Sequence, residues 1–371
     1  TLEPNELGWI QEITYPNSLS ETFSYDLLGN LTNHVDTGGR VTRYSYLPTR
    51  KLSSVTRTIG TTSLTTSVSY DNQFNTLNIT DAKNRAVEKY VLDLQDRITS
   101  VSNLEGQVMS FSYGVSEYVK KTTRFDGTVV SNSYNSDGWL SGVQFPGEYY
   151  SFSYYKNGLL KTATNSLGIV SNAFNPANRL TSSRGVVSNG LVSFAYDAAG
   201  NVTNVIGATC TNSYSFDAAE RLSSLSAFRP QAAPLTFNRS YNANNGLVSA
   251  LTCTNTGITA AYSYNVMDRV TDISWRDASG NLLAGFAYAY DSALNITQRQ
   301  SSVGLSEWSD SYEYDSIDRL TREHRVQSEE DFDIGYAYDE VGNRTQKTLG
   351  DTTVICNYSN GCNRLADWTA A

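Results

Sequence analysis

The residues best suited to acid–base chemistry in this sequence are aspartates that follow an aromatic or apolar residue along the whole chain. A carboxylate can serve as a general acid or base, but such a role belongs to a few uniquely placed side chains. Here the acid recurs at intervals and asparagine replaces it freely. We therefore predict that these residues start turns, because short Asx side chains hydrogen-bond the backbone two residues on. The aspartates are Asp26, Asp71, Asp93, Asp197, Asp217, Asp291, Asp315 and Asp339, and the equivalent asparagines are Asn135, Asn175, Asn242 and Asn265.

Three further aspartates are each followed directly by an arginine. Such pairs could clamp an anionic ligand, but we predict ion pairs within a turn or between repeats, worth about 0–1 kcal/mol each when exposed. The pairs are Asp96–Arg97, Asp268–Arg269 and Asp318–Arg319.

Histidine and cysteine are too sparse for a repeated mechanism or a zinc site. The sequence contains no nucleophile elbow, phosphate loop or His-Glu metal signature. We predict no catalytic residue, no metal site, no cofactor and no enzymatic activity. The cysteines are predicted to be free thiols in strands, and a smaller set of disulfide bridges is the alternative. The residues concerned are His34, His324, Cys210, Cys253, Cys356 and Cys362.

The composition excludes two classes of partner. A net charge of −9 argues against nucleic acid, which requires a Lys/Arg-rich surface. No apolar run approaches the roughly 20 residues that span a bilayer. The chain has 25 Tyr and 13 Phe but only 18% charged residues, with abundant Ser, Thr, Asn and Gly, which is typical of strands and turns.

The element that positions the aspartates is a repeat of 20 to 26 residues, marked by the aromatic residue before the turn. A period of this size indicates a repeat architecture. Counting that residue as position zero gives sixteen copies, at Tyr25, Tyr46, Tyr70, Leu92, Tyr113, Tyr134, Tyr154, Phe174, Tyr196, Phe216, Tyr241, Tyr264, Tyr290, Tyr314, Tyr338 and Tyr358.

The other positions of the repeat predict a strand, a tight turn and a returning strand. A second aromatic residue often stands two residues before position zero, which places both rings on one face of a strand. Position six is apolar in thirteen of the sixteen copies and opens the return strand, and a further apolar residue three later predicts a bulge there. Position four holds residues suited to a positive φ: Gly29, Gly138, Gly158, Gly200, Gly342, Asp268 and Asp318.

Sixteen such hairpins predict an all-β protein, an antiparallel meander of about 32 strands without helices. Twisted open sheets rarely exceed ~10 strands without curling. We therefore predict that the sheet rolls into a spiral, hollow or half-open shell, and that residues 1–371 form one continuous array cut from a longer polypeptide.

The repeat resembles the YD repeats of the RHS family, which includes bacterial RHS toxins, the cocoon subunits of Tc toxins, wall-associated bacterial proteins and teneurins. The resemblance rests on "YDLLGNLT" (25–32), "YDAAGNVT" (196–203), "YNVMDRVT" (264–271), "YDSIDRLT" (314–321) and "YDEVGNRT" (338–345). It implies a secreted or cell-surface bacterial scaffold. Its partners would be its own flanking domains, an enclosed C-terminal effector and an N-terminal delivery region. The Asp-Pro-x-Gly cleavage pattern of the family's toxins is absent, since no proline follows an aspartate here.

The alternative is a surface adhesin or carbohydrate-binding wall protein, with cell-surface glycans or proteins as partners. Exposed aromatic residues could stack on sugars, although aromatics confined to one face at strand spacing favour packing. The tryptophans considered are Trp139, Trp275, Trp308 and Trp368.

Overall fold

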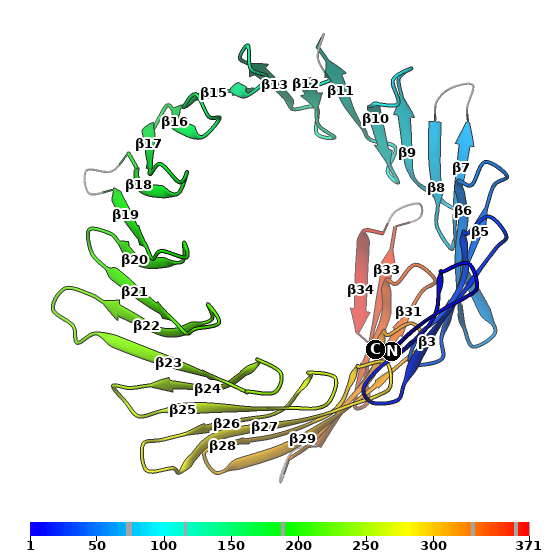
Figure 1. The fold of residues 1–371 in the computed structure, drawn as a ribbon. Helices are drawn as coiled ribbons and strands as arrows, with labels where there is room; N and C mark the ends of the chain where they lie inside the picture. Colours follow the sequence, from blue (N-terminus) through cyan, green and yellow to red (C-terminus); the bar gives the residue numbers. More distant parts are fainter. Residues whose placement is uncertain (72–75, 115–116, 187–189, 328–330, 360–362, 371) are drawn as a thin grey trace. The chain divides into compact units, whose positions relative to one another are not determined.

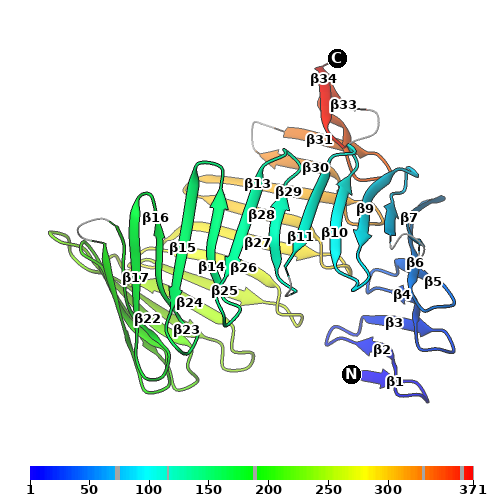
Figure 2. The ribbon, with the colours of Figure 1, turned by 90° about the horizontal axis from the view of Figure 1, so that it is seen from above.

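The computed structural model describes residues 1–71, 76–114, 117–186, 190–327, 331–359 and 363–370, and these residues form strands and turns with no helix. Nothing in this part of the chain is a helix long and apolar enough to cross a membrane. The 34 strands belong to one sheet. Within each part of the chain, consecutive strands lie next to one another as antiparallel hairpins (Figures 1 and 2).

The strands follow one another at short intervals. Those of the first third are β1 (Leu2–Pro4), β2 (Ile10–Thr14), β3 (Ser20–Tyr25), β4 (Leu31–Val35), β5 (Val41–Tyr46), β6 (Leu52–Ile59), β7 (Thr62–Asp71), β8 (Thr76–Thr80), β9 (Ala86–Leu92), β10 (Ile98–Asn103), β11 (Val108–Tyr113) and β12 (Val119–Thr123). Those of the middle are β13 (Val129–Tyr134), β14 (Leu140–Phe145), β15 (Glu148–Tyr154), β16 (Leu160–Asn165), β17 (Gly168–Phe174), β18 (Leu180–Arg184), β19 (Leu191–Tyr196), β20 (Val202–Ile206), β21 (Thr211–Phe216), β22 (Leu222–Phe228), β23 (Leu235–Tyr241) and β24 (Val248–Cys253). Those of the last third are β25 (Thr259–Tyr264), β26 (Val270–Arg276), β27 (Leu282–Tyr290), β28 (Ile296–Val303), β29 (Ser306–Tyr314), β30 (Leu320–Gln327), β31 (Asp331–Tyr338), β32 (Arg344–Leu349), β33 (Thr352–Tyr358) and β34 (Leu365–Ala370).

The contacts of the chain divide it into two compact units. Unit 1 comprises Thr1–Gln107, Tyr262–Trp275 and Leu282–Ala371, and unit 2 comprises Val108–Ala261 and Arg276–Asn281. We call the hairpins of residues 1–107 the early hairpins and those of residues 282–371 the late hairpins of unit 1.

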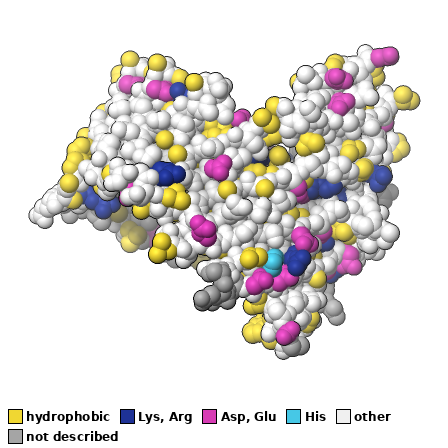
Figure 3. Space-filling model, turned by 90° about the horizontal axis from the view of Figure 1, so that it is seen from below, with side chains coloured by type: hydrophobic (Ala, Val, Ile, Leu, Met, Phe, Trp, Pro, Cys, Tyr) yellow, Lys and Arg dark blue, Asp and Glu magenta, His cyan; other side chains and the backbone are white. Residues whose placement is uncertain are grey.

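The sheet has almost no fully buried interior. Among the described residues, those classed as buried are Val130, Ala260, Cys356, Thr42, Ser301 and Asp310. Most strand residues are half-buried, as expected for a single layer that no second layer covers. Acidic, basic and apolar side chains are interspersed over the face in Figure 3, and much of that face is backbone and small polar side chains. Cohesion must therefore come from contacts between neighbouring hairpins.

The repeat predicted from the sequence governs the strand boundaries. Every odd-numbered strand from β3 to β33 ends at position zero, except β7, which continues to Asp71. The even strands begin at position six, with two differences: β24 begins at Val248 and β34 at Leu365, because the preceding turns contain one more residue. Arg364 therefore belongs to the turn, which explains why it broke the apolar pattern.

An additional hairpin precedes the sixteen predicted copies. It consists of β1 and β2, with Pro4 at position zero, Asn5 as the turn-starting Asx residue and Gly8 at position four. Because a proline replaces the aromatic residue, the sequence pattern did not include this copy, and the described chain has 34 strands instead of about 32.

The predicted bulge lies directly after position six. In the hairpin of β3 and β4, Tyr25 pairs with Leu31 while Ser24 pairs with Asn33, so Thr32 at position seven is the extra residue. The same register shift recurs between β13 and β14, between β19 and β20 and between β29 and β30. The bulge lets the apolar residues at positions six and nine lie on one face despite their odd spacing.

Candidate functional site

The turn that follows position zero, here called the YD turn, is built around the side chain at position one. Asp26 Oδ1 accepts the backbone N–H groups of Leu28 and Asn30, both at 2.9 Å. The N–H of Gly29 donates to the carbonyl of Asp26 at 3.1 Å and closes the loop. Asn175 accepts two backbone N–H groups in the same way, at 3.0 and 2.9 Å, so the turn requires the acceptor and not the charge. The predicted residues Asp197, Asp291, Asp315 and Asp339 also accept N–H groups of their own turns, whereas the residues that follow Asp71, 72–75, lie outside the described chain.

The second carboxylate oxygen binds the side chain at position five. Arg319 Nε donates to Asp315 Oδ2 at 2.6 Å, and Arg97 Nε donates to Asp93 Oδ2 at 2.8 Å. The partner of each arginine is thus the aspartate four residues earlier, not the adjacent one considered in the sequence. The hydrogen bond from Arg97 lowers the pKa of Asp93 below its usual value of 3.8. The turn of Arg269 begins with an asparagine, whose Oδ1 accepts the backbone N–H of Arg269 at 3.0 Å.

Position four has a positive φ in copies of very different side chain. The glycines Gly29, Gly200 and Gly342 have φ of 84°, 105° and 90°. Asp268 and Asp318 have φ of 58° and 67°. Arg50, Glu220 and Leu294 adopt the same conformation at the same position, so the turn imposes it on residues that pay a conformational cost.

Threonine at position seven fixes the bulge. Thr32 Oγ1 donates to the carbonyl of Ser24, opposite it in the hairpin, at 3.1 Å. The equivalent bonds come from Thr99, Thr181 and Thr321, each at 3.1 Å.

The tyrosine at position zero ties each copy to the one before it. Its hydroxyl donates to the backbone carbonyl at position six of the preceding copy, as Tyr290 does to Val270 at 2.7 Å and Tyr314 to Ile296 at 3.0 Å. Burial raises the pKa of both phenols, which keeps them in the donating form. The same bond is made by Tyr25, Tyr134, Tyr154, Tyr196, Tyr241, Tyr338 and Tyr358.

The side chain at position five adds a second tie, because in many copies it packs on the position-zero ring of the next one. Trp139 lies against Tyr154 with ring centroids 5.4 Å apart, and the Arg221 guanidinium lies 4.2 Å from the ring centroid of Tyr241. The equivalent pairs are Trp9–Tyr25, Lys51–Tyr70, Tyr118–Tyr134, Arg179–Tyr196 and Arg319–Tyr338. Aromatic pairs contribute about 0.5–1.5 kcal/mol beyond their buried area, and cation–π pairs a similar amount.

Unit 1 contains a third kind of contact, between hairpins more than 250 residues apart. We call it the seam. It joins the second turns of the early hairpins, which connect each even strand to the next odd strand, to the YD turns of the late hairpins. Thr37 Oγ1 donates to the carbonyl of Ser292 at 2.6 Å, and Ser316 Oγ donates to the carbonyl of Thr58 at 3.2 Å. The sheet of unit 1 therefore returns to itself edge to edge, as a spiral requires.

Ion pairs reinforce the seam. Lys83 Nζ lies 2.6 Å from Asp339 Oδ2, and Arg364 lies 3.1 Å from Glu105. Burial alone would raise the pKa of Asp339, but the hydrogen bonds from Lys83 and Asn343 hold it below 3.8. The carboxylate therefore stays charged at any pH above about 4.

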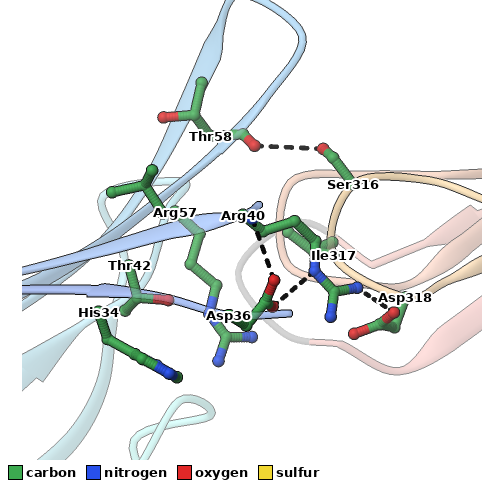
Figure 4. Close-up of a pocket in the computed structure, with 10 residues that line it drawn as sticks. His34, Asp36, Arg40, Thr42, Arg57, Thr58, Ser316, Ile317 and Asp318 are labelled. Atoms are coloured by element: carbon green, nitrogen blue, oxygen red, sulfur yellow. Dashed lines mark hydrogen bonds and ion pairs between the residues drawn. The ribbon is translucent and has the colours of Figure 1, made fainter. Parts of the chain in front are cut away.

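A small cavity of about 80 Å³ lies in the seam (Figure 4). Arg40 crosses it, bound to Asp36 of its own turn at 2.7 Å and to Asp318 of a late YD turn. His34 also lines the cavity, and its Nε2 lies 3.1 Å from Glu21. Every acid at this place has a basic partner, so the cavity is a structural joint with no arrangement for proton transfer.

One charged cluster has no counterpart in the repeat and was missed by the sequence reasoning. Asp310 is fully buried between Arg299 and Arg325, which stand directly opposite it on the two neighbouring strands. Arg299 Nη2 donates at 2.7 Å and Arg325 Nε at 2.6 Å. Burial raises the pKa of Asp310, yet the two guanidinium groups lower it overall. A single acid in the row of inward strand positions was the available signal.

The remaining candidate residues are dispersed. Among the described tryptophans only Trp368 is exposed, whereas Trp139 packs within the ladder of turns. Cys210, Cys253 and Cys356 are free thiols, and Cys362 lies outside the described residues. His324 pairs with Asp331 at 2.8 Å. Within the described ranges, no three His, Cys, Asp or Glu side chains gather as metal ligands.

The fold and these contacts define a repeat-built β wall whose neighbouring hairpins are coupled turn by turn. A family model described as teneurin YD-shell matches residues 155–358, more than half of the chain, and one described as RHS repeat matches residues 5–41. The chain belongs to the teneurin YD-shell family, as the sequence predicted, and its role is structural.

Solved structures share this fold. The crystal structure of TcdB2-TccC3-Cdc42 is 15% identical with a TM-score of 0.77, over 98% of this chain and 24% of that one. The crystal structure of TcdB2-TccC3 is 14% identical with a TM-score of 0.78, over 98% and 24%. A Tc holotoxin pore of Photorhabdus luminescens with a mutated TccC3 is 14% identical with a TM-score of 0.76, over 95% and 22%. The chain spans about a quarter of the length of these structures, and no curated protein matches it.

Proposed function

We propose that this chain is one part of a closed shell wall, continuous over residues 1–371, that encloses an effector domain of the same polypeptide. The protein would be secreted or displayed on a bacterial surface, where such a shell keeps its contents folded away until delivery. The likeness to TcdB2-TccC3 structures supports this proposal, and the chain itself would act as a container, not as a catalyst.

The observation that carries the proposal is the seam of unit 1. A wall that retains a polypeptide must close the gap between hairpins that are distant in sequence, since an open sheet edge would let the contents escape. In the seam, YD turns of the late hairpins meet second turns of the early hairpins through hydrogen bonds and buried ion pairs. These contacts contribute nothing to a single hairpin, so their value lies in sealing the wall.

Small-angle scattering tests the hollow architecture. A compact domain of 371 residues has a radius of gyration of about 21 Å. We expect a clearly larger value and a pair-distance distribution with the broad maximum of a shell. A radius near 21 Å with the profile of a solid body would contradict the proposal.

Enclosure itself is tested on the full reading frame that contains this chain. We expect a protease to spare the enclosed effector until the shell is denatured, and Lys83→Glu, which reverses one seam ion pair, to shorten that protection. Equal digestion of the effector with and without the shell would refute enclosure while leaving the wall architecture intact.

A further inference from the structure

The seam shows what the side chain at position three of a YD turn does. Ile317 and Val341 occupy this position in two late hairpins, and both are half-buried. They line a cavity of about 440 Å³ together with Val55, Leu64 and Val87 of the early hairpins. Each apolar turn tip thus fits against the aliphatic ends of strands on the opposing second-turn edge.

Two copies of the same turn tip have no such cover. Leu7 and Leu28 occupy position three in the first two hairpins of unit 1, and they are 66% and 53% exposed. A single exposed leucine needs no explanation, but these two repeat a position whose seated form is seen elsewhere in unit 1. We call them the free tips.

The opposing surface also exists in an uncovered form. The residue five before position zero begins the odd strands, and Val41 and Val87, which line the two seam cavities, are half-buried there. On five successive odd strands of unit 2 the same position is apolar and exposed by 36–50%. These residues form what we call the free stripe: Val108, Val129, Tyr149, Ile169 and Leu191.

Charge favours a match between the two surfaces. In the seam, basic side chains of the second turns, such as Lys83, meet acidic side chains of the YD turns, such as Asp339. Residues 108–261, which carry the free stripe, contain more Lys and Arg than Asp and Glu, whereas residues 1–107, which carry the free tips, contain more Asp and Glu. Complementary charge of this kind accelerates encounter and fixes orientation.

We propose that the free stripe of one molecule docks the free tips of a second copy of this chain, in a contact that repeats the seam between molecules. The contact is heterologous, because a tip of one copy meets the stripe of the next, so association is head-to-tail. The inference goes beyond the enclosing function, and either can fail without the other.

Sedimentation velocity and light scattering over a wide concentration range test the proposal. We expect the mass to rise with concentration above the 40.8 kDa of one chain. Val129→Lys with Ile169→Lys removes the stripe, and Leu7→Asp with Leu28→Asp removes the tips. Because all four side chains are exposed, the folded state should be preserved, as hydrogen exchange would verify.

Mixing the two variants distinguishes this contact from any other. Each variant alone should stay monomeric, whereas an equimolar mixture should form a dimer, because one chain keeps its tips and the other keeps its stripe. The control, Ser133→Lys with Ser215→Lys, adds the same charge at exposed positions near the other end of the strands and should associate like the unaltered chain. A monomer at every concentration would overturn the proposal, and so would association that survives loss of the stripe or a mixture that stays monomeric.

Discussion

Removing one phenolic hydroxyl tests whether the tie between neighbouring copies stabilises the wall. We consider Tyr290→Phe, which keeps the ring and deletes only the bond of 2.7 Å to the carbonyl of Val270. A net hydrogen bond contributes about 0.5–1.5 kcal/mol, and an acceptor left without a partner costs about 1–3 kcal/mol when it is buried. Tyr290 is half-buried, so water reaches part of the site, and we expect a loss of about 1–2 kcal/mol.

The assay must be local, because a repeat array does not unfold as one unit. Hydrogen exchange of β26–β28 should show opening increased by a factor of roughly 5–30, while hairpins of unit 2 exchange as before. Tyr290→Ala should lose about 3–5 kcal/mol, since it also removes the ring.

A matched control exists in the chain. Phe174 lacks the hydroxyl, and Asn172 Nδ2 supplies a donor to the corresponding carbonyl of Leu160 at 3.2 Å. Phe174→Tyr should therefore change local stability by no more than about 0.5 kcal/mol. Unchanged exchange in Tyr290→Phe, or an equal response to both substitutions, would refute the inter-copy role of the hydroxyl.

Three further substitutions separate the parts of the turn and the seam. Asp315→Asn should lower local stability by only about 0–1 kcal/mol, because it keeps the backbone acceptor, whereas Asp315→Ala should lose about 1–3 kcal/mol; equal losses by hydrogen exchange would contradict the Asx role. Gly342→Ala should cost about 1–2 kcal/mol for its φ of 90°, and Gly29→Ala should cost more in chemical denaturation, because its methyl would lie 2.7 Å from an indole carbon. The pKa of Asp339 is below 3.8 in the folded chain, so its contribution is fully present above its unfolded pKa and is lost as the pH falls through the folded value; seam protection should stay constant from about pH 8 to 5 and decline only below about 4, and in Lys83→Gln that protection should be weaker throughout.

The sequence was sufficient for what lies within one copy. Tyr25, Asp26 and Gly29 each have a job that short-range geometry dictates: a strand end, a turn acceptor and a positive φ. Even the bulge followed from the odd spacing of apolar residues, and the all-β meander followed from the repetition of these signals. Only the copy at Pro4 escaped, because the aromatic marker is absent there.

Contacts between copies could not be predicted in the same way, because they depend on how neighbouring hairpins are offset. The acceptor of the Tyr290 hydroxyl is a backbone carbonyl, which leaves no trace in the sequence. The packing of position five left a weaker signal: Trp9 and Trp139 are each followed, one copy later, by glycine at position four, Gly29 and Gly158. The buried Asp310 and the seam depend on the positions of distant strands, which no local pattern specifies.

The seam also sets the order in which the wall can be completed. Hairpins whose partners are adjacent in sequence can form as soon as they are made, but the partner of Thr37 is Ser292, 255 residues further along. At a synthesis rate of about 5–20 residues per second, an early hairpin waits roughly 13–50 s for the turn that will cover it. During that interval its aliphatic groove stands open, and closing it costs the loop entropy of the whole intervening chain. The seam is therefore the last joint to form and the first point at which a nascent wall can capture the wrong edge.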